Sequence, residues 1–215
     1  MSRTWLPRRL SVGILALFAL AGGGAPARAQ DPGSDPRAVT VIGSSPHARR
    51  CNAALAEADN SDRALSYCER ALDYPRLAAP AAAQLHINLG VMRMRRGEHL
   101  TAIEQFDAAI NIDERLAEAF LNRGAAQVQL RDYGAAIASL TEALSLGVQE
   151  PHKAFFNRGV ARESLGDLRG AFEDYSTALE IEPDWGPANA ELARFARGRR
   201  ENLASRLGEP TTTSP

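Results

Sequence analysis

A spacing of small residues that occurs three times constrains the fold of this chain more than any other feature. A glycine is followed twelve residues later by an alanine, and seven residues after that by a second alanine. The sets are Gly90-Ala102-Ala109, Gly124-Ala136-Ala143 and Gly159-Ala171-Ala178, at steps of 34 and then 35 residues. A fixed period of this length is typical of repeat architectures, in which each unit stacks on its neighbours.

Each repeat is predicted to form two helices. Apolar residues recur at intervals of three and four along each half of the unit, which is the helical period. Gly97 and Gly166 fall between the two halves, where a helix is expected to end. Asp132 and Asp167 follow at the positions expected to cap the second helix of their units. The small residues of the period are expected to let the paired backbones approach closely.

With these features the chain resembles the tetratricopeptide-repeat family. That family has a small residue at repeat position 8, alanine at positions 20 and 27, and a large apolar residue at position 24. Position 24 is here Phe106, Leu140 and Tyr175, and the proline of position 32 is present in the last unit as Pro183. The usual aromatic residue of position 11 is replaced by Arg93, Gln127 and Arg162. The resemblance implies an all-α solenoid of helix-turn-helix repeats.

The repeat register divides the chain into units. Residues 83–116, 117–150 and 152–185 are the three clear repeats, and residues 46–79 form a divergent first unit with Ala64 and Ala71 in the register of Ala102 and Ala109. Residues 186–206 are predicted to form a capping helix, because the last repeat would otherwise expose an apolar face.

The two ends of the chain differ from the repeats. Residues 1–29 combine early arginines, an apolar run from Leu10 to Ala21 and an Ala27-Arg28-Ala29 ending, which predicts a secretory signal peptide. Since a membrane-spanning helix takes ~20 apolar residues, an uncleaved anchor is the weaker alternative. Residues 30–45 are interpreted as a flexible leader and residues 207–215 as a disordered tail. We therefore expect an exported protein, periplasmic if the source is a Gram-negative bacterium, by either the general or the twin-arginine route.

The charge of the chain argues against a nucleic-acid partner. The formal net charge is -1, and the predicted signal peptide contains four arginines and no acidic residue. Its removal leaves a net negative chain, whereas nucleic-acid binding relies on basic surfaces. We expect neither a nucleic-acid partner nor stable membrane insertion after signal cleavage.

The two cysteines, Cys51 and Cys68, fall at repeat positions 7 and 24 of the first unit. The resemblance implies that these positions face each other across the paired helices. In an exported protein such a pair is expected to form a disulfide. Two buried free thiols and a redox-active pair are the alternatives.

The resemblance also implies that ligands lie along a concave wall formed by the first helices. Position 6 of that wall is asparagine in three successive units, as Asn88, Asn122 and Asn157. A side-chain amide both donates and accepts hydrogen bonds, so a row of amides can pair with the backbone of an extended peptide. The alternative is that these asparagines only satisfy helix packing. The neighbouring groove positions are apolar: Ile87, Leu121, Phe156, Val91 and Val160.

The arginines at repeat position 7, Arg123 and Arg158, are expected to make structural ion pairs. Arg158 with Asp174 is a candidate for an exposed pair along the partner helix. Such exposed pairs contribute only ~0.2 to 1 kcal/mol.

No motif of the sequence indicates catalysis. The four histidines lack metal-ligand spacing, and no Gly-x-Ser-x-Gly elbow, phosphate loop or dinucleotide fingerprint is present. We therefore expect no enzyme, no cofactor and no metal. The predicted function is a scaffold or adaptor that binds a protein or peptide segment. The alternatives are a self-assembling structural protein of the envelope and an accessory subunit of an envelope enzyme.

Overall fold

The computed structural model of the protein describes residues 45–207, and their side chains as far as residue 198. This part of the chain is built from helices: α1 (Pro46–Ala56), α2 (Asp62–Leu72), α3 (Ala79–Arg95), α4 (His99–Ile112), α5 (Ala117–Gln129), α6 (Tyr133–Ser145), α7 (Pro151–Ser164), α8 (Leu168–Ile181) and α9 (Gly186–Leu207). The predicted signal peptide lies outside the described residues. So do the leader as far as residue 44 and the tail from residue 208.

The helix ends follow the sequence signals. Ser45 is the N-cap of α1, and its hydroxyl accepts a hydrogen bond from the Ala48 amide. The side chains of Asp132 and Asp167 cap α6 and α8 in the same way, as predicted. Gly97 has φ 80°, which places it in the left-handed region where a residue without a Cβ is favoured.

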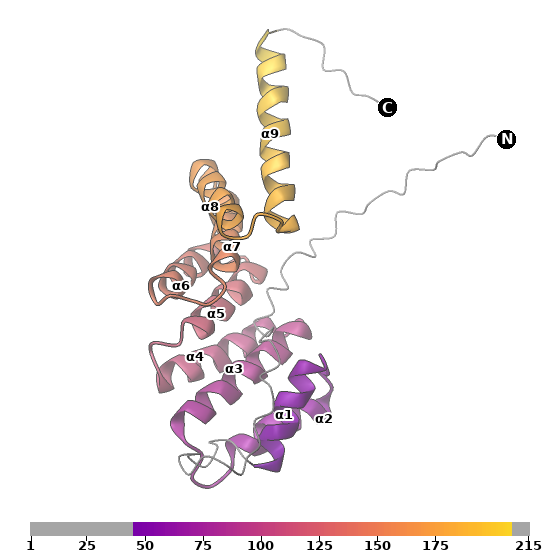
Figure 1. Ribbon diagram of the computed structural model, residues 1–215, viewed down its shortest axis with the longest axis vertical. Helices are drawn as coiled ribbons and strands as arrows, with labels where there is room; N and C mark the ends of the chain where they lie inside the picture. Colours follow the sequence, from indigo (N-terminus) through magenta and orange to yellow (C-terminus); the bar gives the residue numbers. More distant parts are fainter. Residues whose placement is uncertain (1–44, 208–215) are drawn as a thin grey trace, which may run out of the picture.

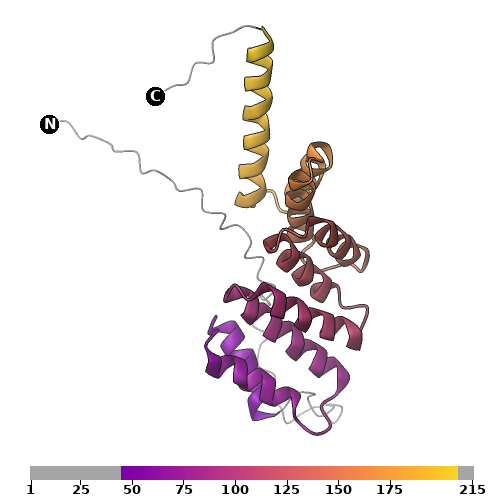
Figure 2. The same cartoon turned by 180° about the vertical axis from the view of Figure 1, so that it is seen from behind.

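The helices form four successive pairs arranged along the long axis of the molecule (Figure 1). The first helices α1, α3, α5 and α7 contact one another in order, and each second helix contacts the first helix of the next pair. Among the described residues, no comparable contact joins successive second helices. The first helices therefore form the more closely packed layer, and the stack curves around them. Figure 2 shows the same succession of pairs from behind.

The small residues of the period allow this close pairing. A Cβ atom built on Gly90 would lie 2.5 Å from the Phe106 ring, and one on Gly124 would lie 2.6 Å from Leu140. Each repeat glycine thus leaves room for the large residue at position 24 on the partner helix. The repeat alanines, from Ala102 to Ala178, are fully buried in the same seams.

The last helix, α9, follows the four pairs and packs against the last of them. It contacts α8, and Ala188, Leu192 and Phe195 in its first half join the apolar cluster of the last pair. The predicted class, an all-α solenoid of helix pairs with a C-terminal capping helix, is confirmed. Within residues 45–207, no helix combines the length and the hydropathy required to cross a membrane.

Candidate functional site

The candidate site is the layer of first helices, where the three asparagines of the repeat register lie. Asn88 is on α3, Asn122 on α5 and Asn157 on α7. All three are buried, with 3%, 3% and 1% of their surface exposed. A buried side-chain amide normally requires hydrogen-bond partners, so the partners of each amide decide what the row can do.

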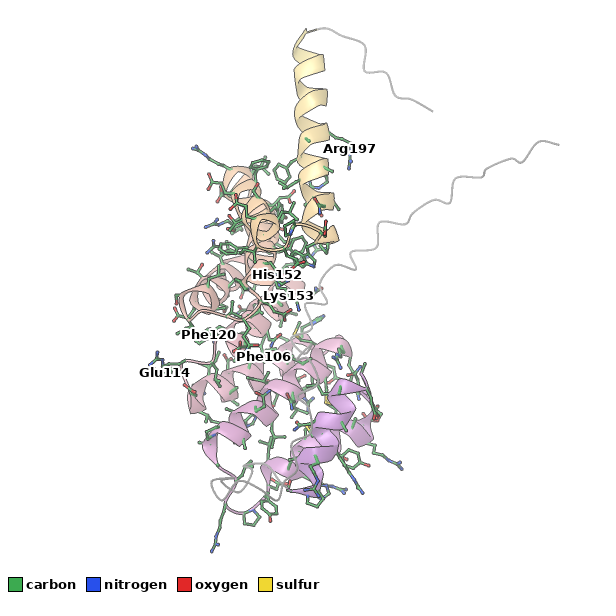
Figure 3. All side chains as sticks on the ribbon, viewed as in Figure 1. Phe106, Glu114, Phe120, His152, Lys153 and Arg197 are labelled. Carbon is green, nitrogen blue, oxygen red and sulfur yellow. A yellow bond between two sulfur atoms is a disulfide. The ribbon has the colours of Figure 1, made fainter. Side chains whose placement is uncertain are left out.

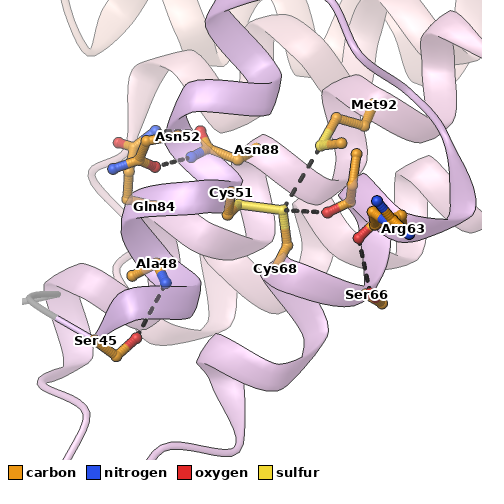
Figure 4. The surroundings of a disulfide bond; sticks show 11 residues. Ser45, Ala48, Cys51, Asn52, Arg63, Ser66, Cys68, Gln84, Asn88 and Met92 are labelled. Atoms are coloured by element: carbon orange, nitrogen blue, oxygen red, sulfur yellow. Dashed lines mark hydrogen bonds between the residues drawn. A yellow bond between two sulfur atoms is a disulfide. The ribbon is translucent and has the colours of Figure 1, made fainter.

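Asn88 has its partners within the protein (Figure 4). Its Nδ2 atom donates to the side chain of Asn52 on α1 at 2.8 Å, and its Oδ1 accepts from Gln84 at 2.9 Å. Asn52 and Gln84 are both exposed. The amide of Asn88 therefore lies at the surface end of the seam between α1 and α3 and helps to hold these helices together.

The other two asparagines differ from Asn88. Among the described residues, neither the Nδ2 atom of Asn122 nor the two polar side-chain atoms of Asn157 have a hydrogen-bond partner. Leaving a buried polar group unpaired costs about 1–3 kcal/mol. Both side-chain amides therefore contain buried polar atoms without a partner among the described residues.

The repeat register explains this difference. Asn52 precedes Ala64 by the same twelve residues that separate Gly90 from Ala102 and Gly124 from Ala136. The place of Asn52 is thus taken by glycine in the later units, and glycine has no side chain that could pair with Asn122 or Asn157.

The apolar groove positions that the sequence predicts belong to different clusters. Ile87 and Val91 pack with Phe106, and Phe120 covers the same cluster (Figure 3). Leu121 lies in the cluster between the third and fourth pairs. These side chains are buried, so the structure assigns them to the seams between successive units. It does not place them on an open surface.

Phe156 and Val160 lie at the C-terminal end of the layer, in the cluster that α9 joins. The ring of Trp185 makes an edge contact with Phe156 and another with His152, each with centroids 4.9 Å apart. Burial lowers the pKa of His152 and thus favours its neutral form. Sequence reasoning did not connect Trp185 with the candidate site, because a residue that occurs once gives no repeat signal.

Two cations flank the asparagines. Arg95 on α3 donates from Nη1 to the backbone carbonyl of Leu55 at 3.0 Å, and burial lowers the pKa of this arginine. Lys153 on α7 pairs with Glu150 at 2.6 Å (Figure 3). The two cations therefore differ: the charge of Lys153 is paired with a carboxylate, whereas the guanidinium of Arg95, on the N-terminal side of the layer, is partly desolvated.

The position 7 arginines connect successive units. Arg123 donates to Asp107 on α4 at 2.7 Å and to Ser139 on α6 at 3.1 Å. It thereby joins the second helix of its own unit to that of the preceding one. The contact with Asp107 was not predicted, because it depends on how two units stack and not on the spacing within one.

A polar cluster of Arg194, Glu163 and Tyr175 holds α9 against the last pair. Arg194 on α9 donates to Glu163 on α7 at 2.6 Å, and the Tyr175 hydroxyl of α8 donates to the same carboxylate at 3.0 Å. Burial, together with the negative charge of Glu163 and its hydrogen bond, raises the pKa of Tyr175. Three helices are joined through one carboxylate.

The predicted cysteine pair is brought together at the other end of the molecule. The sulfur atoms of Cys51 and Cys68 lie at bonding distance, with Cα atoms 4.9 Å apart, and both residues are fully buried (Figure 4). Met92 of α3 contacts Cys68. The pair therefore fixes α1 to α2 beside the seam that contains Asn88.

Among the side chains that the structure describes, as far as residue 198, no group of three or more metal-ligating residues could hold a metal ion. The site is thus built from amides, apolar seams and a few ion pairs.

The repeats of this chain are similar to those of known proteins. A family model for the tetratricopeptide repeat matches residues 53–120 and 121–185. The first such domain of Spaghetti (RPAP3), solved bound to the HSP90 peptide SRMEEVD, is 26% identical with a TM-score of 0.52, and the match covers 55% of this chain and 93% of that one. The domain of Arabidopsis OM64 is also 26% identical, with a TM-score of 0.54 and coverage of 56% and 99%. MamA is 25% identical, with a TM-score of 0.59 and coverage of 72% and 88%. No curated protein sequence matches significantly.

Proposed function

Because the chain belongs to the tetratricopeptide-repeat family, we propose that its layer of first helices binds an extended segment of another protein. The partner backbone lies across α3, α5 and α7, and its amide and carbonyl groups pair with Asn122 and Asn157. Asn88, which already has partners within the chain, fixes the N-terminal end of this surface.

The observation that carries this proposal is that the Nδ2 atom of Asn122 and both polar side-chain atoms of Asn157 are buried without a partner among the described residues. Their positions repeat from one unit to the next, as a ligand backbone that crosses successive helices requires. An unpaired buried amide costs about 1–3 kcal/mol, and a bound backbone removes that cost. Packing alone gives no reason to retain asparagine at positions where the partner residue has become glycine.

The similar domain of Spaghetti supports the general function, since it is bound to a peptide. At the ligand positions that the sequence predicts for this chain, the cations are Arg95 and Lys153, which lie on different helices, and Lys153 is already paired with Glu150. We propose that backbone hydrogen bonds and apolar contacts contribute more to binding here than a carboxylate of the partner does.

The proposed role is that of a non-catalytic scaffold or adaptor. The predicted signal peptide over residues 1–29 and the cysteine pair both favour export, and the periplasm is the proposed location. The partner is then a protein of the same compartment, recognised through an extended segment.

The test is capture of that partner from an envelope extract. Replacing Asn122 and Asn157 together by alanine is expected to abolish capture and to leave the helical circular dichroism unchanged, whereas Asn88 is left in place because it pairs with Asn52 and Gln84. Asn111→Ala is the matched control, because Asn111 is exposed on α4 outside the layer. Capture that persists in the double variant at the level of the control contradicts the proposal.

A further inference from the structure

The first half of α8 carries an apolar face that the described part of the chain leaves open. Leu168 and Phe172 lie one helical turn apart, with 55% and 49% of their surface exposed, and Leu165 in the preceding turn is 60% exposed. On one side the ring of Phe172 contacts Phe195 of α9, with centroids 6.2 Å apart. The face lies at the end of the repeat stack, beside α9 (Figures 1 and 2).

The repeat register shows what covers this position elsewhere in the stack. Ile103 on α4 and Ile137 on α6 occupy the position of Phe172 in the two preceding units. Both isoleucines are partly buried, and each packs in an apolar cluster that includes residues of the following pair. Among the described residues no further pair follows α8, and about half of the Phe172 surface stays exposed. The face is therefore open where the next pair would lie.

We propose that two copies of the chain associate through this face of α8, with the two helices antiparallel and related by a two-fold axis. In such a contact the same patch occurs on both subunits, and each contact between two residues occurs twice. Leu168 of each copy packs against Phe172 of the other. The surface belongs to α8 and not to the layer of first helices, so this inference is independent of the proposed function.

The charges on this face favour a second copy as the occupant. Arg169 and Glu173 lie on the same side of α8, since each follows a residue of the apolar face by one position. Their mutual contact, at 3.4 Å, leaves the two side chains 92% and 63% exposed. In an antiparallel pair of α8 helices, Arg169 of one copy lies opposite Glu173 of the other, and the two-fold axis repeats this pair. The face is therefore complementary to itself in charge as well as in apolar surface.

The charges also select the antiparallel arrangement. A parallel two-fold pair places the charged sides of the two α8 helices on opposite sides of the contact, where Arg169 and Glu173 of different copies cannot meet. Exposed ion pairs contribute little affinity and act mainly on orientation. The affinity comes from burying the apolar face, which is smaller than a standard interface of about 1,200–2,000 Å². We therefore expect a weak dimer that forms as the protein concentration rises.

The test is the average mass of the purified protein as a function of concentration, measured by sedimentation equilibrium. We expect the mass to rise from that of one chain towards that of two and not beyond, because a two-fold contact closes on itself. Leu168→Glu is expected to weaken association by about tenfold or more, since it places a carboxylate in the apolar contact of each copy. Leu100→Glu is the matched control, because Leu100 is 68% exposed at the start of α4, outside the face.

A charge exchange tests the arrangement of the two helices. Arg169→Glu alone and Glu173→Arg alone are each expected to weaken association several-fold, since each places like charges opposite each other across the contact. Arg169→Glu combined with Glu173→Arg restores opposite charges and is expected to associate like the unaltered protein. Association of the double variant that is weaker than that of either single variant contradicts the antiparallel contact.

Three further results overturn the inference. The first is a mass that stays that of a single chain up to about 1 mM, which leaves the face to a different protein. The second is association that Leu168→Glu and Leu100→Glu affect equally, which places the contact elsewhere on the molecule. The third is a mass that rises beyond two chains, which identifies a contact between two different surfaces.

Discussion

Arg158 on α7 makes two hydrogen bonds to the carboxylate of Asp174 on α8, at 3.0 and 2.7 Å. Asp174 is 2% exposed and also accepts a hydrogen bond from Arg162 at 2.9 Å. The sequence predicted the pair of Arg158 and Asp174 but placed it on the surface. The prediction of exposure was wrong, because position 23 of the last unit lies in the seam between α7 and α8.

Asp174→Asn is therefore expected to destabilise the protein by on the order of 3 kcal/mol, because two arginines lose their common counter-charge in a buried seam. The midpoint of denaturant unfolding measures this change. Glu173→Gln is the control, since Glu173 is exposed and its removal is expected to cost less than about 0.5 kcal/mol. Equal effects of the two substitutions contradict a structural role of the buried carboxylate.

Gly159→Ala is expected to destabilise the last pair by about 1–3 kcal/mol, the usual range for overpacking a core. The new Cβ would lie 2.7 Å from the Tyr175 ring and 3.3 Å from the Ala171 carbonyl oxygen, which is backbone and cannot move freely. Gly134→Ala tests the same change in α6, where nothing lies within 4 Å. It is expected to be neutral or to stabilise by up to about 1 kcal/mol. The midpoints of thermal unfolding of the two variants show whether the steric contact at Gly159 or the helix propensity of alanine determines the change in stability.

Much of the fold could be predicted because it follows rules that act within one repeat. Gly90, Ala102 and Phe106 predict the pairing of two helices from their spacing alone. The partners of Asn88 could not be predicted in this way, since Asn52 reaches it only when α1 and α3 are stacked. The contacts of Arg194 could not be predicted either, because α9 occurs once and has no equivalent helix in the repeats.

The cysteine pair leads to a third prediction. We expect the unfolded, unreduced protein to show no reactive thiol, and Cys51→Ala with Cys68→Ala to lower stability by about 3 kcal/mol, as the chain-entropy model gives for a loop of this size. Addition of a dithiol reductant is expected to destabilise the unaltered protein and to leave the double variant unchanged. Two titratable thiols in the unreduced protein contradict a disulfide.

The environment of Tyr175 predicts a dependence of stability on alkaline pH. Its pKa in the folded protein is raised by burial and by Glu163, whereas an unfolded tyrosine titrates near 10. The contribution of Tyr175 is therefore complete below about pH 10 and is lost as the pH rises above that value, by up to ~1.4 kcal/mol at pH 11.

Tyr175→Phe is expected to lower stability at pH 8, because the hydrogen bond to Glu163 is lost, and to flatten the decline between pH 8 and pH 11. Thermal unfolding at the two pH values measures both effects. Parallel declines in the variant and the unaltered protein contradict the assigned environment of the tyrosine.

Binding of an extended segment to Asn122 and Asn157 is tested by titrating the isotopically labelled protein with the captured partner segment and observing the side-chain amide resonances. If the layer of first helices binds this segment, the signals of Asn122 and Asn157 shift and saturate together with binding, while that of the exposed Asn111 stays in place. Saturable binding that leaves the Asn122 and Asn157 signals unchanged contradicts the account.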